Sequence, residues 1–274
     1  MKEFACGRFR LPLSRPLVMG ILNVTPDSFS DGGRHVVLSD ALNHAEAMLK
    51  AGADILDIGG ESTRPGAPVV AAEEEIARVV PVLSALSSFN VPLSIDTCKP
   101  EVMRAALEVG VDMVNDIAAL EGEGALTTLA ATSAGVCLMH KQGDPQTMQA
   151  APHYADVVAE VRAYLAQRAA DAMTAGIARE RILLDPGFGF GKTFEHNAAL
   201  FRALPQLIAE LGFPQLIGVS RKSMLGQITG RPVSERAVAS VTAALLAAQA
   251  GAAVLRVHDV AETVDALKVW QALK

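Results

Sequence analysis

Short apolar segments recur along the whole chain, and each is followed by a polar residue and then by a helix-like pattern. The segments are rich in Val, Ile and Leu. Continuous hydrophobicity of this kind is typical of parallel strands that are covered on both faces. The pattern predicts eight strands, at residues 17–23, 53–59, 91–96, 112–116, 135–140, 181–185, 215–220 and 253–258.

The stretches between these segments have the spacing of amphipathic helices. Apolar stripes at intervals of three and four residues can each cover a sheet. Two such stripes are Ile76, Val79, Val80, Leu83 and Leu86, and Val157, Val158, Val161 and Leu165. Pro is favoured in a first helical turn and Gly at a helix end. We therefore read helix boundaries at Pro100, at Asp259 with Glu262 as a variant capping box, and at Gly52, Gly110 and Gly176.

Eight strand-then-helix units without a break in composition predict one domain over residues 1–274. The leading fold is a closed (β/α)₈ barrel, and a doubly wound open sheet is the alternative. In both folds, ligands bind beyond the carboxyl ends of the strands. Long connections follow the first and second strands, at residues 24–37 and 60–72, and we expect them to be lids over the site.

Charge and composition exclude several classes of partner. The chain has 24 basic and 30 acidic residues, a net charge of −6, and no basic run, so nucleic acid is not expected as a partner. The N-terminus lacks the apolar core of a signal peptide, which favours a cytoplasmic location. Residues 237–255 are uncharged but Ala-rich, which predicts a buried helix and strand and not a membrane span. Cys6, Cys98 and Cys137 form no Cys-x-x-Cys pair, and we read Cys98 as small apolar filler.

The polar residues at the predicted strand ends are unusual in kind. A carboxylate there can accept two parallel hydrogen bonds from the edge of a flat heterocycle, and Asp185 is the best such acceptor. Guanidinium groups suit a phosphate, and Arg64, Arg256 and His258 are the candidates. We expect Asp57 and Asp116 to make ordinary capping or scaffold bonds, and His140 to be structural. The whole set is Asn23, Asp57, Asp96, Asn115, Asp116, His140, Asp185, Lys222, Arg256 and His258.

The glycine-rich stretch DPGFGFGKT at residues 185–193 is not a phosphate loop. Pro186 stands where the Walker pattern requires Gly, and Lys192 stands where the dinucleotide fingerprint requires its third Gly. The glycines more simply permit close approach of the backbone and Phe190 to a planar ligand. For Lys192, the sequence is equally compatible with a solvated surface residue and with a residue that contacts the ligand.

Eight motifs together resemble the dihydropteroate synthase family, in that family's order and over nearly the whole chain. They are MGILNVTPDSFSDGG, GGESTRPGA, SIDTCKP, VNDI, LMHKQG, LLDPGFGFGK, GVSRKSMLG and LRVHDV. The resemblance implies a TIM-type barrel that joins hydroxymethyl-dihydropterin pyrophosphate to p-aminobenzoate, giving 7,8-dihydropteroate and pyrophosphate. It also implies Mg²⁺ as cofactor and a homodimer packed through outer helices.

The resemblance assigns roles to matching positions of this chain. Asp96, Asp185, Lys222 and Arg256 would be catalytic, and Asn23 would contact the magnesium ion. The pterin set would be Asp96, Asn115, Ile117, Met139, Asp185, Gly218 and Lys222. Pyrophosphate would be held by Asn23, Arg64, Arg256 and His258. The p-aminobenzoate set would be Phe29, Thr63, Arg64, Pro65, Phe190, Lys222 and Ser223.

Two other functions compete with this one. A pterin-dependent methyltransferase would share the pterin pocket, but NVTPDSFSDGG and SRKS are typical of the synthase. A catalytically silent pterin-binding barrel would be expected to lack Asn23, Arg64 or Arg256, and all of these are present. The chain departs from the family at Lys141, where Met is frequent, and at Cys98, where Ser is common.

Overall fold

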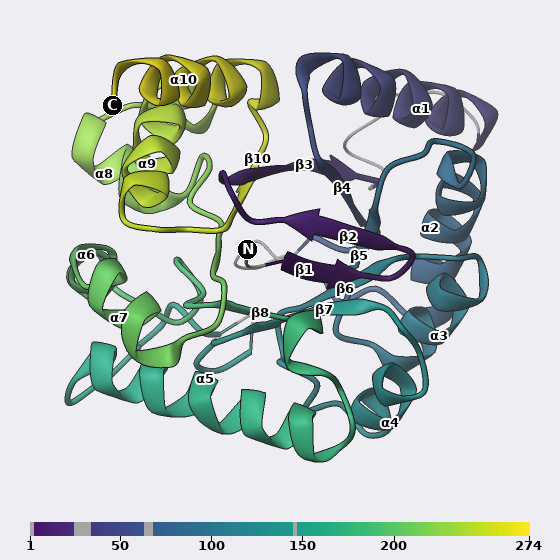
Figure 1. The fold of residues 1–274 in the computed structure, drawn as a ribbon, viewed down its shortest axis with the longest axis horizontal. Coiled ribbons are helices and arrows are strands. Elements are labelled where there is room, and N and C mark those ends of the chain that lie inside the picture. The colour runs from purple at the N-terminus through teal and green to yellow at the C-terminus, as the bar shows by residue number, and fades with distance from the viewer. Residues whose placement is uncertain (1–2, 25–33, 63–67, 145–146) are drawn as a thin grey trace.

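The computed structural model describes residues 3–24, 34–62, 68–144 and 147–274, and within them eight parallel strands surround a central axis (Figure 1). The predicted site residues Phe29, Thr63, Arg64 and Pro65 lie outside the described residues. The order of neighbouring strands is β8-β7-β6-β5-β4-β3-β10-β9. A single bridge between Leu184 and Gln215 joins β8 to β9, so the sheet is a nearly closed barrel. The open doubly wound sheet is therefore wrong.

Each predicted strand is present. β9 is shorter than expected, because the chain leaves the ladder after Ile217 and turns, with the Lys222 amide donating to the Val219 carbonyl. The strands are β3 (Leu17–Asn23), β4 (Ile55–Gly59), β5 (Leu93–Asp96), β6 (Met113–Asp116), β7 (Gly135–Met139), β8 (Ile182–Asp185), β9 (Leu216–Ile217) and β10 (Val254–Val257).

Helices cover the outside of the barrel (Figure 1). The two predicted apolar stripes lie on α2 and α5, where Val79, Leu83, Val161 and Leu165 are fully buried. Pro100 is the first residue of α3, as predicted. The helices are α1 (Arg34–Ala51), α2 (Ala72–Leu86), α3 (Pro100–Glu108), α4 (Ala125–Ala130), α5 (Val157–Thr174), α6 (Phe194–Arg202), α7 (Leu204–Leu211), α8 (Ser223–Thr229), α9 (Ala237–Gln249) and α10 (Val260–Leu273).

The uncharged stretch 237–255 forms α9 and β10, as the composition predicts. The buried face of α9 is built from small residues, Ser240, Ala243, Ala244, Ala247 and Ala248, which bring the helix close to the sheet. Among the described residues, no helix combines the length and the hydropathy needed to cross a membrane.

Alternation along the strands separates two apolar cores. Side chains that point outward, such as Leu22, Ile58 and Leu138, pack against the helices in the larger core. Side chains that point inward near the amino ends, such as Met19 and Ile55, form a smaller core inside the barrel. Because successive side chains alternate, the inward positions two residues further along reach the opposite, carboxyl mouth.

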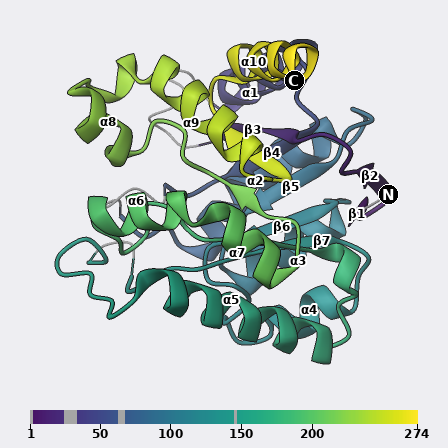
Figure 2. The ribbon, with the colours of Figure 1, turned by 60° about the vertical axis from the view of Figure 1, so that its left-hand side comes forward.

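An N-terminal hairpin, which the strand pattern did not predict, closes the amino end of the barrel. It consists of β1 (Glu3–Cys6) and β2 (Phe9–Pro12), paired antiparallel. Figure 2 shows it at the opposite side of the molecule from α8. Phe4 is fully buried in the inner core, and a Cβ on Gly135 would lie 2.6 Å from Phe4 Cζ. The absence of a side chain at Gly135 therefore makes room for the Phe4 ring.

We predict that Phe4→Ala lowers the free energy of unfolding by about 3–5 kcal/mol, because it removes a large ring from a closed core and leaves a cavity. Arg10→Ala, on an exposed position of β2, is the control and should change stability by less than about 0.5 kcal/mol. Urea unfolding of both variants checks this. Equal midpoints would show that the hairpin does not seal the barrel.

Candidate active site

Polar side chains from separate strands meet at the carboxyl mouth of the barrel. They occupy inward positions one step above the inner apolar core, as the alternation requires. Register pairs Asp96 with Asn115 across β5 and β6, and Arg256 lies beside Met19 across β10 and β3. These residues converge because the inward positions of neighbouring strands lie side by side at the same end of the barrel.

Arg256 spans the mouth and joins two carboxylates on other strands. Its Nε donates to Asp57 Oδ2 at 2.6 Å, and its Nη2 donates to Asp96 Oδ2 at 2.6 Å. Asn115 Nδ2 also donates to Asp57 Oδ2, at 3.2 Å. The cluster therefore connects β10 with β4, β5 and β6.

This cluster has spare acceptors. Asp57 is fully buried, and neither Asp57 Oδ1 nor Asp96 Oδ1 has a hydrogen-bond partner among the described residues. The carboxylates of Asp57 and Asp96 share the single guanidinium of Arg256. When both are ionised, the cluster therefore has a net negative charge in a largely buried position. Burial raises the pKa of Asp96 to about 7, although the charge of Arg256 acts in the opposite direction. The same carboxylates hold the pKa of Arg256 above its usual value, against the effect of burial.

Asp185 ends β8 on the other side of the mouth and is 6% exposed. Its Oδ1 accepts a hydrogen bond from the Gly187 amide at 2.7 Å. Burial raises the pKa of Asp185, and the charge of Lys222 opposes this shift most strongly among its neighbours. Lys222 donates to the Phe188 carbonyl, and its Nζ lies 4.3 Å from the centroid of the Phe190 ring. Burial lowers the pKa of Lys222 to about 8.

A small apolar cluster forms one wall of the mouth. It consists of Ile117, Met139, Met148 and Phe190, with Cys98 packed against it. Burial raises the pKa of the Cys98 thiol to about 11, so the thiol stays neutral. The reading of Cys98 as apolar filler is confirmed, and the wall offers a flat ring an apolar face beside the carboxylates.

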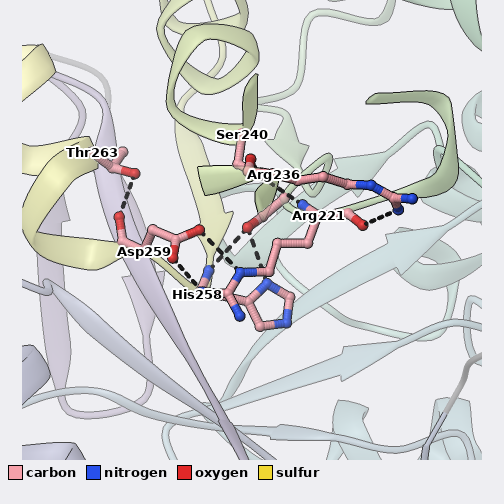
Figure 3. Close-up of polar contacts among 7 residues, drawn as sticks. Arg221, Arg236, Ser240, His258, Asp259 and Thr263 are labelled. Atoms are coloured by element: carbon pink, nitrogen blue, oxygen red, sulfur yellow. Dashed lines mark hydrogen bonds and ion pairs between the residues drawn. The ribbon is translucent and has the colours of Figure 1, made fainter. Parts of the chain in front are cut away.

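His258 belongs to a polar network at the ends of β9 and β10, together with Arg221 and Asp259 (Figure 3). Ser220 Oγ lies 3.0 Å from His258 Nδ1. Arg221 Nη2 donates to Asp259 Oδ1 at 2.5 Å, and the Arg221 amide donates to Ser240 Oγ at 2.9 Å. The predicted capping box is wrong, because the Asp259 carboxylate binds Arg221 and makes no cap hydrogen bond.

Asn23, at the end of β3, meets one requirement of a magnesium ligand. Its side-chain oxygen lies at the mouth, beside Gly59. A Cβ on Gly59 would lie 3.6 Å from Asn23 Oδ1 and 3.9 Å from Asp96 Oδ2. The described residues contain no group of three or more His, Cys, Asp or Glu that could hold a metal. A single amide oxygen suits Mg²⁺ that is shared with phosphate oxygens and water.

The structure tests three readings of the sequence. The scaffold role expected for Asp57 is confirmed, since its Oδ2 accepts hydrogen bonds from Arg256 Nε and Asn115 Nδ2, while its Oδ1 has no partner among the described residues. Lys192 is 2% exposed, so the solvated-surface reading is wrong. The capping role of Asp116 is confirmed, since its carboxylate accepts hydrogen bonds from the amides of Ala118 and Leu120 at 2.7 Å each.

Comparison with known proteins agrees with this geometry. Residues 19–258 match the family model described as "Pterin binding enzyme". The chain is 56% identical over 273 residues to dihydropteroate synthase of Neisseria meningitidis serogroup B strain MC58, covering 97% of this chain and 96% of the relative.

Two solved structures are also similar to this chain. Xanthomonas albilineans dihydropteroate synthase with 4-aminobenzoic acid has a TM-score of 0.93 and 54% identity, covering 99% of this chain and 98% of that chain. Burkholderia cenocepacia dihydropteroate synthase complexed with 7,8-dihydropteroate has a TM-score of 0.90 and 53% identity, covering 99% and 96%.

The barrel and its mouth thus define a pterin-binding enzyme. More narrowly, the chain belongs to the dihydropteroate synthase family, and it is a transferase. The alternative assignment of the chain as a pterin-dependent methyltransferase is therefore not supported.

We predict that Asp96→Asn flattens the pH dependence of stability in the ligand-free protein. The unfolded carboxyl loses its proton near pH 4, while the folded one keeps it until about pH 7, so Asp96 lowers the free energy of unfolding as pH rises between these values. Urea titrations from pH 4 to 7 measure the slope. Asp265→Asn, at a carboxylate that is 79% exposed, is the control. An unchanged slope in Asp96→Asn would contradict the assignment.

Proposed function

We propose that the mouth joins hydroxymethyl-dihydropterin pyrophosphate to p-aminobenzoate, with 7,8-dihydropteroate and pyrophosphate as products. The observation that carries this proposal is the pair of free carboxylate oxygens on Asp57 and Asp96, opposite Asp185 in an apolar-walled mouth. A pterin has a row of ring and amino N–H donors, which are the partners that these acceptors lack.

The pterin ring would lie between the apolar wall and the carboxylates. Asp185 is the acceptor for an amidine-like edge, because its ionised form can accept two parallel hydrogen bonds. Asp96 and Asn115 would bind further along the ring, and Lys222 would bind an acceptor on the same edge as Asp185. Gly218 leaves space above Arg256, since a Cβ there would lie 3.8 Å from Arg256 Cβ. Ile117 and Met139 supply the apolar contact.

The reaction separates charge, and the mouth is arranged to stabilise both fragments. The amine nitrogen of p-aminobenzoate attacks the methylene carbon, the carbon–oxygen bond breaks with its electron pair leaving on the pyrophosphate oxygen, and the amine nitrogen releases one proton to solvent. Positive charge develops on the methylene and the ring, near Asp96 and Asp185, while negative charge grows on the pyrophosphate. Arg256 and His258, together with Arg64, would bind the leaving group.

The arylamine needs no strong base, because its nitrogen is already neutral near pH 7. Positioning is then the main contribution of the protein to this half of the reaction. Phe190, Lys222 and Ser223 would contact p-aminobenzoate. Ser223 is exposed at the start of α8, beside the mouth. The remaining members of this set are Phe29, Thr63, Arg64 and Pro65.

Mg²⁺ is the cofactor that we propose, with Asn23 as its protein ligand. When bound, it would neutralise charge on the pyrophosphate. Asn23 holds its amide oxygen beside Gly59, where no side chain intrudes.

We also propose that the chain forms a homodimer through α8 and α9. A groove of about 680 Å³ lies along these helices and is lined by Met224, Ile228, Val238 and Leu246, among others. Val238 is 80% exposed and Ile228 is 62% exposed, although both are aliphatic. Large exposed apolar faces are typical of interaction surfaces.

A coupled assay tests the reaction. The purified chain is mixed with both substrates and Mg²⁺, each component is omitted in turn, and pyrophosphate and dihydropteroate are measured. We expect equal amounts of the two products only in the complete mixture. Pterin binding without any product would instead favour a silent binding barrel.

We predict that Asp185→Asn weakens pterin binding tenfold to a hundredfold, corresponding to about 1–3 kcal/mol. The amide keeps the acceptor for the Gly187 N–H but presents an N–H₂ to the donor edge of the ring. Isothermal titration measures the dissociation constant. The matched control is Asp112→Asn, at a buried carboxylate that accepts from the Leu93 amide at the amino end of the barrel. If the two variants bound the pterin with equal affinity, Asp185 would not be a pterin-binding residue.

We predict that Val238→Asp converts the dimer to monomer, because a charge at the centre of an apolar interface would be desolvated without a partner. Sedimentation equilibrium measures the mass. Met173→Asp, on α5 and 39% exposed, should leave the dimer intact. If Val238→Asp remains dimeric, the interface lies elsewhere.

A further inference from the structure

A buried lysine lies beneath the mouth and takes no part in the reaction as described. Lys192 is 2% exposed, and among the described residues its ammonium has hydrogen-bond contacts only with a histidine ring nitrogen and backbone carbonyls. A buried charge without an ion-pair partner is costly unless other groups satisfy it. Its contacts therefore indicate what this side chain holds in place.

The Lys192 ammonium is surrounded by neutral acceptors. Its Nζ lies 2.9 Å from His140 Nδ1, and it donates to the carbonyls of Gly187 at 2.9 Å and Phe190 at 3.1 Å. The His140 carbonyl lies further away, at 3.3 Å. Burial, with the charge of Lys192, lowers the pKa of His140 to about 3, so the ring is neutral and its Nδ1 is free to accept.

These carbonyls belong to the turn that carries Phe190. Gly187 has a φ of +70°, and a Cβ there would lie 1.9 Å from the His140 carbonyl oxygen, so only glycine fits. The turn is held by hydrogen bonds on two sides. Lys192 donates to the carbonyls of Gly187 and Phe190. Lys222 donates to the carbonyl of Phe188. One lysine lies inside the protein and the other lies in the mouth.

We propose that Lys192 is a positioning residue, whose ammonium fixes the 187–190 turn and thereby sets where Phe190 and Lys222 meet p-aminobenzoate. The role rests on the proposed reaction. Phe190 packs in the apolar wall with Met139, and the Lys222 ammonium lies 4.3 Å from the Phe190 ring centroid. A shift of the turn would move both contacts together, and misplacement by about 1 Å costs up to about a hundredfold in rate.

Lys192 also acts on Asp185 through its charge. The charged or titratable groups that face Asp185 are Lys222, Lys192, Arg256 and the Cys137 thiol. Lys192 favours the ionised form of Asp185. Burial lowers the pKa of Lys192 to about 7, so the ammonium form predominates on the acidic side of this value. Removing this positive charge would raise the pKa of Asp185, so binding that requires the carboxylate would be lost at a higher pH.

The test compares Lys192→Met with Arg181→Met. Arg181 is the matched control, because it is also a buried cation that donates to backbone carbonyls, of Ala134 and Leu129 at 2.8 Å each, but at the amino end of β8. Both variants should lower the melting temperature. Steady-state kinetics with each substrate varied, from pH 5 to 9, then separate positioning from stability.

We expect Lys192→Met to lower kcat/KM for p-aminobenzoate by about tenfold to a hundredfold and to move the acidic limb of the profile to higher pH. Arg181→Met should leave both within about twofold. If Lys192→Met does not fold, His140→Leu is the second variant: it removes one acceptor of the Lys192 ammonium and should cause part of the same loss in kcat/KM. His140→Asn keeps an acceptor and should cause a smaller loss. Lys192→Met or His140→Leu kinetics equal to those of Arg181→Met would overturn the proposal, whereas an inactive wild-type enzyme would instead refute the proposed reaction.

Discussion

Arg256 cannot satisfy both of the carboxylates that it joins. One guanidinium on β10 reaches Asp57 on β4 and Asp96 on β5, and each carboxylate keeps an oxygen without a partner among the described residues. In a mouth with little water, this arrangement is unfavourable for the empty protein and favourable for a ligand that brings N–H donors. Burial, together with the charge of Asp57, raises the pKa of Asp96 against the effect of Arg256.

The barrel makes this arrangement possible by dividing each strand into an apolar and a polar part. The inner core and the Phe4 hairpin fill the amino end, so the strands are held firmly where no chemistry occurs. Two residues further along, the same inward face presents Asp57, Asn115 and Arg256. The glycine-rich turn after β8 then closes the other side of the mouth, with a lysine on each of its faces. Rigid strands and a turn held by two lysines keep the hydrogen-bond acceptors of the mouth in fixed positions. Fixed acceptors allow the site to select a flat ring over ligands of other shapes.

The sequence predicts the fold well because its signals are local and repeated. The sequence predicts the strand ends correctly at Asn23, Asp96, Asp116 and Asp185, where an apolar run stops at a polar residue, and at Gly59. The hairpin was missed because Glu3–Cys6 and Phe9–Pro12 are short and pair only with each other. The capping prediction at Asp259 failed because a tertiary partner, Arg221, competes for the carboxylate.

The roles of Asp57 and Lys192 depend on which residues meet in space, and no local pattern contains that information. The sequence predicts a scaffold role for Asp57, but not that its partner is Arg256, 199 positions away. Proton release on binding tests the account most directly. Hydroxymethyl-dihydropterin without its diphosphate is titrated calorimetrically near pH 7 in two buffers of different ionisation enthalpy, with wild type and Asp96→Asn. Donors that bind the Asp96 carboxylate must expel its proton, so the wild type should release protons and Asp96→Asn should release fewer; equal release by both would contradict the account.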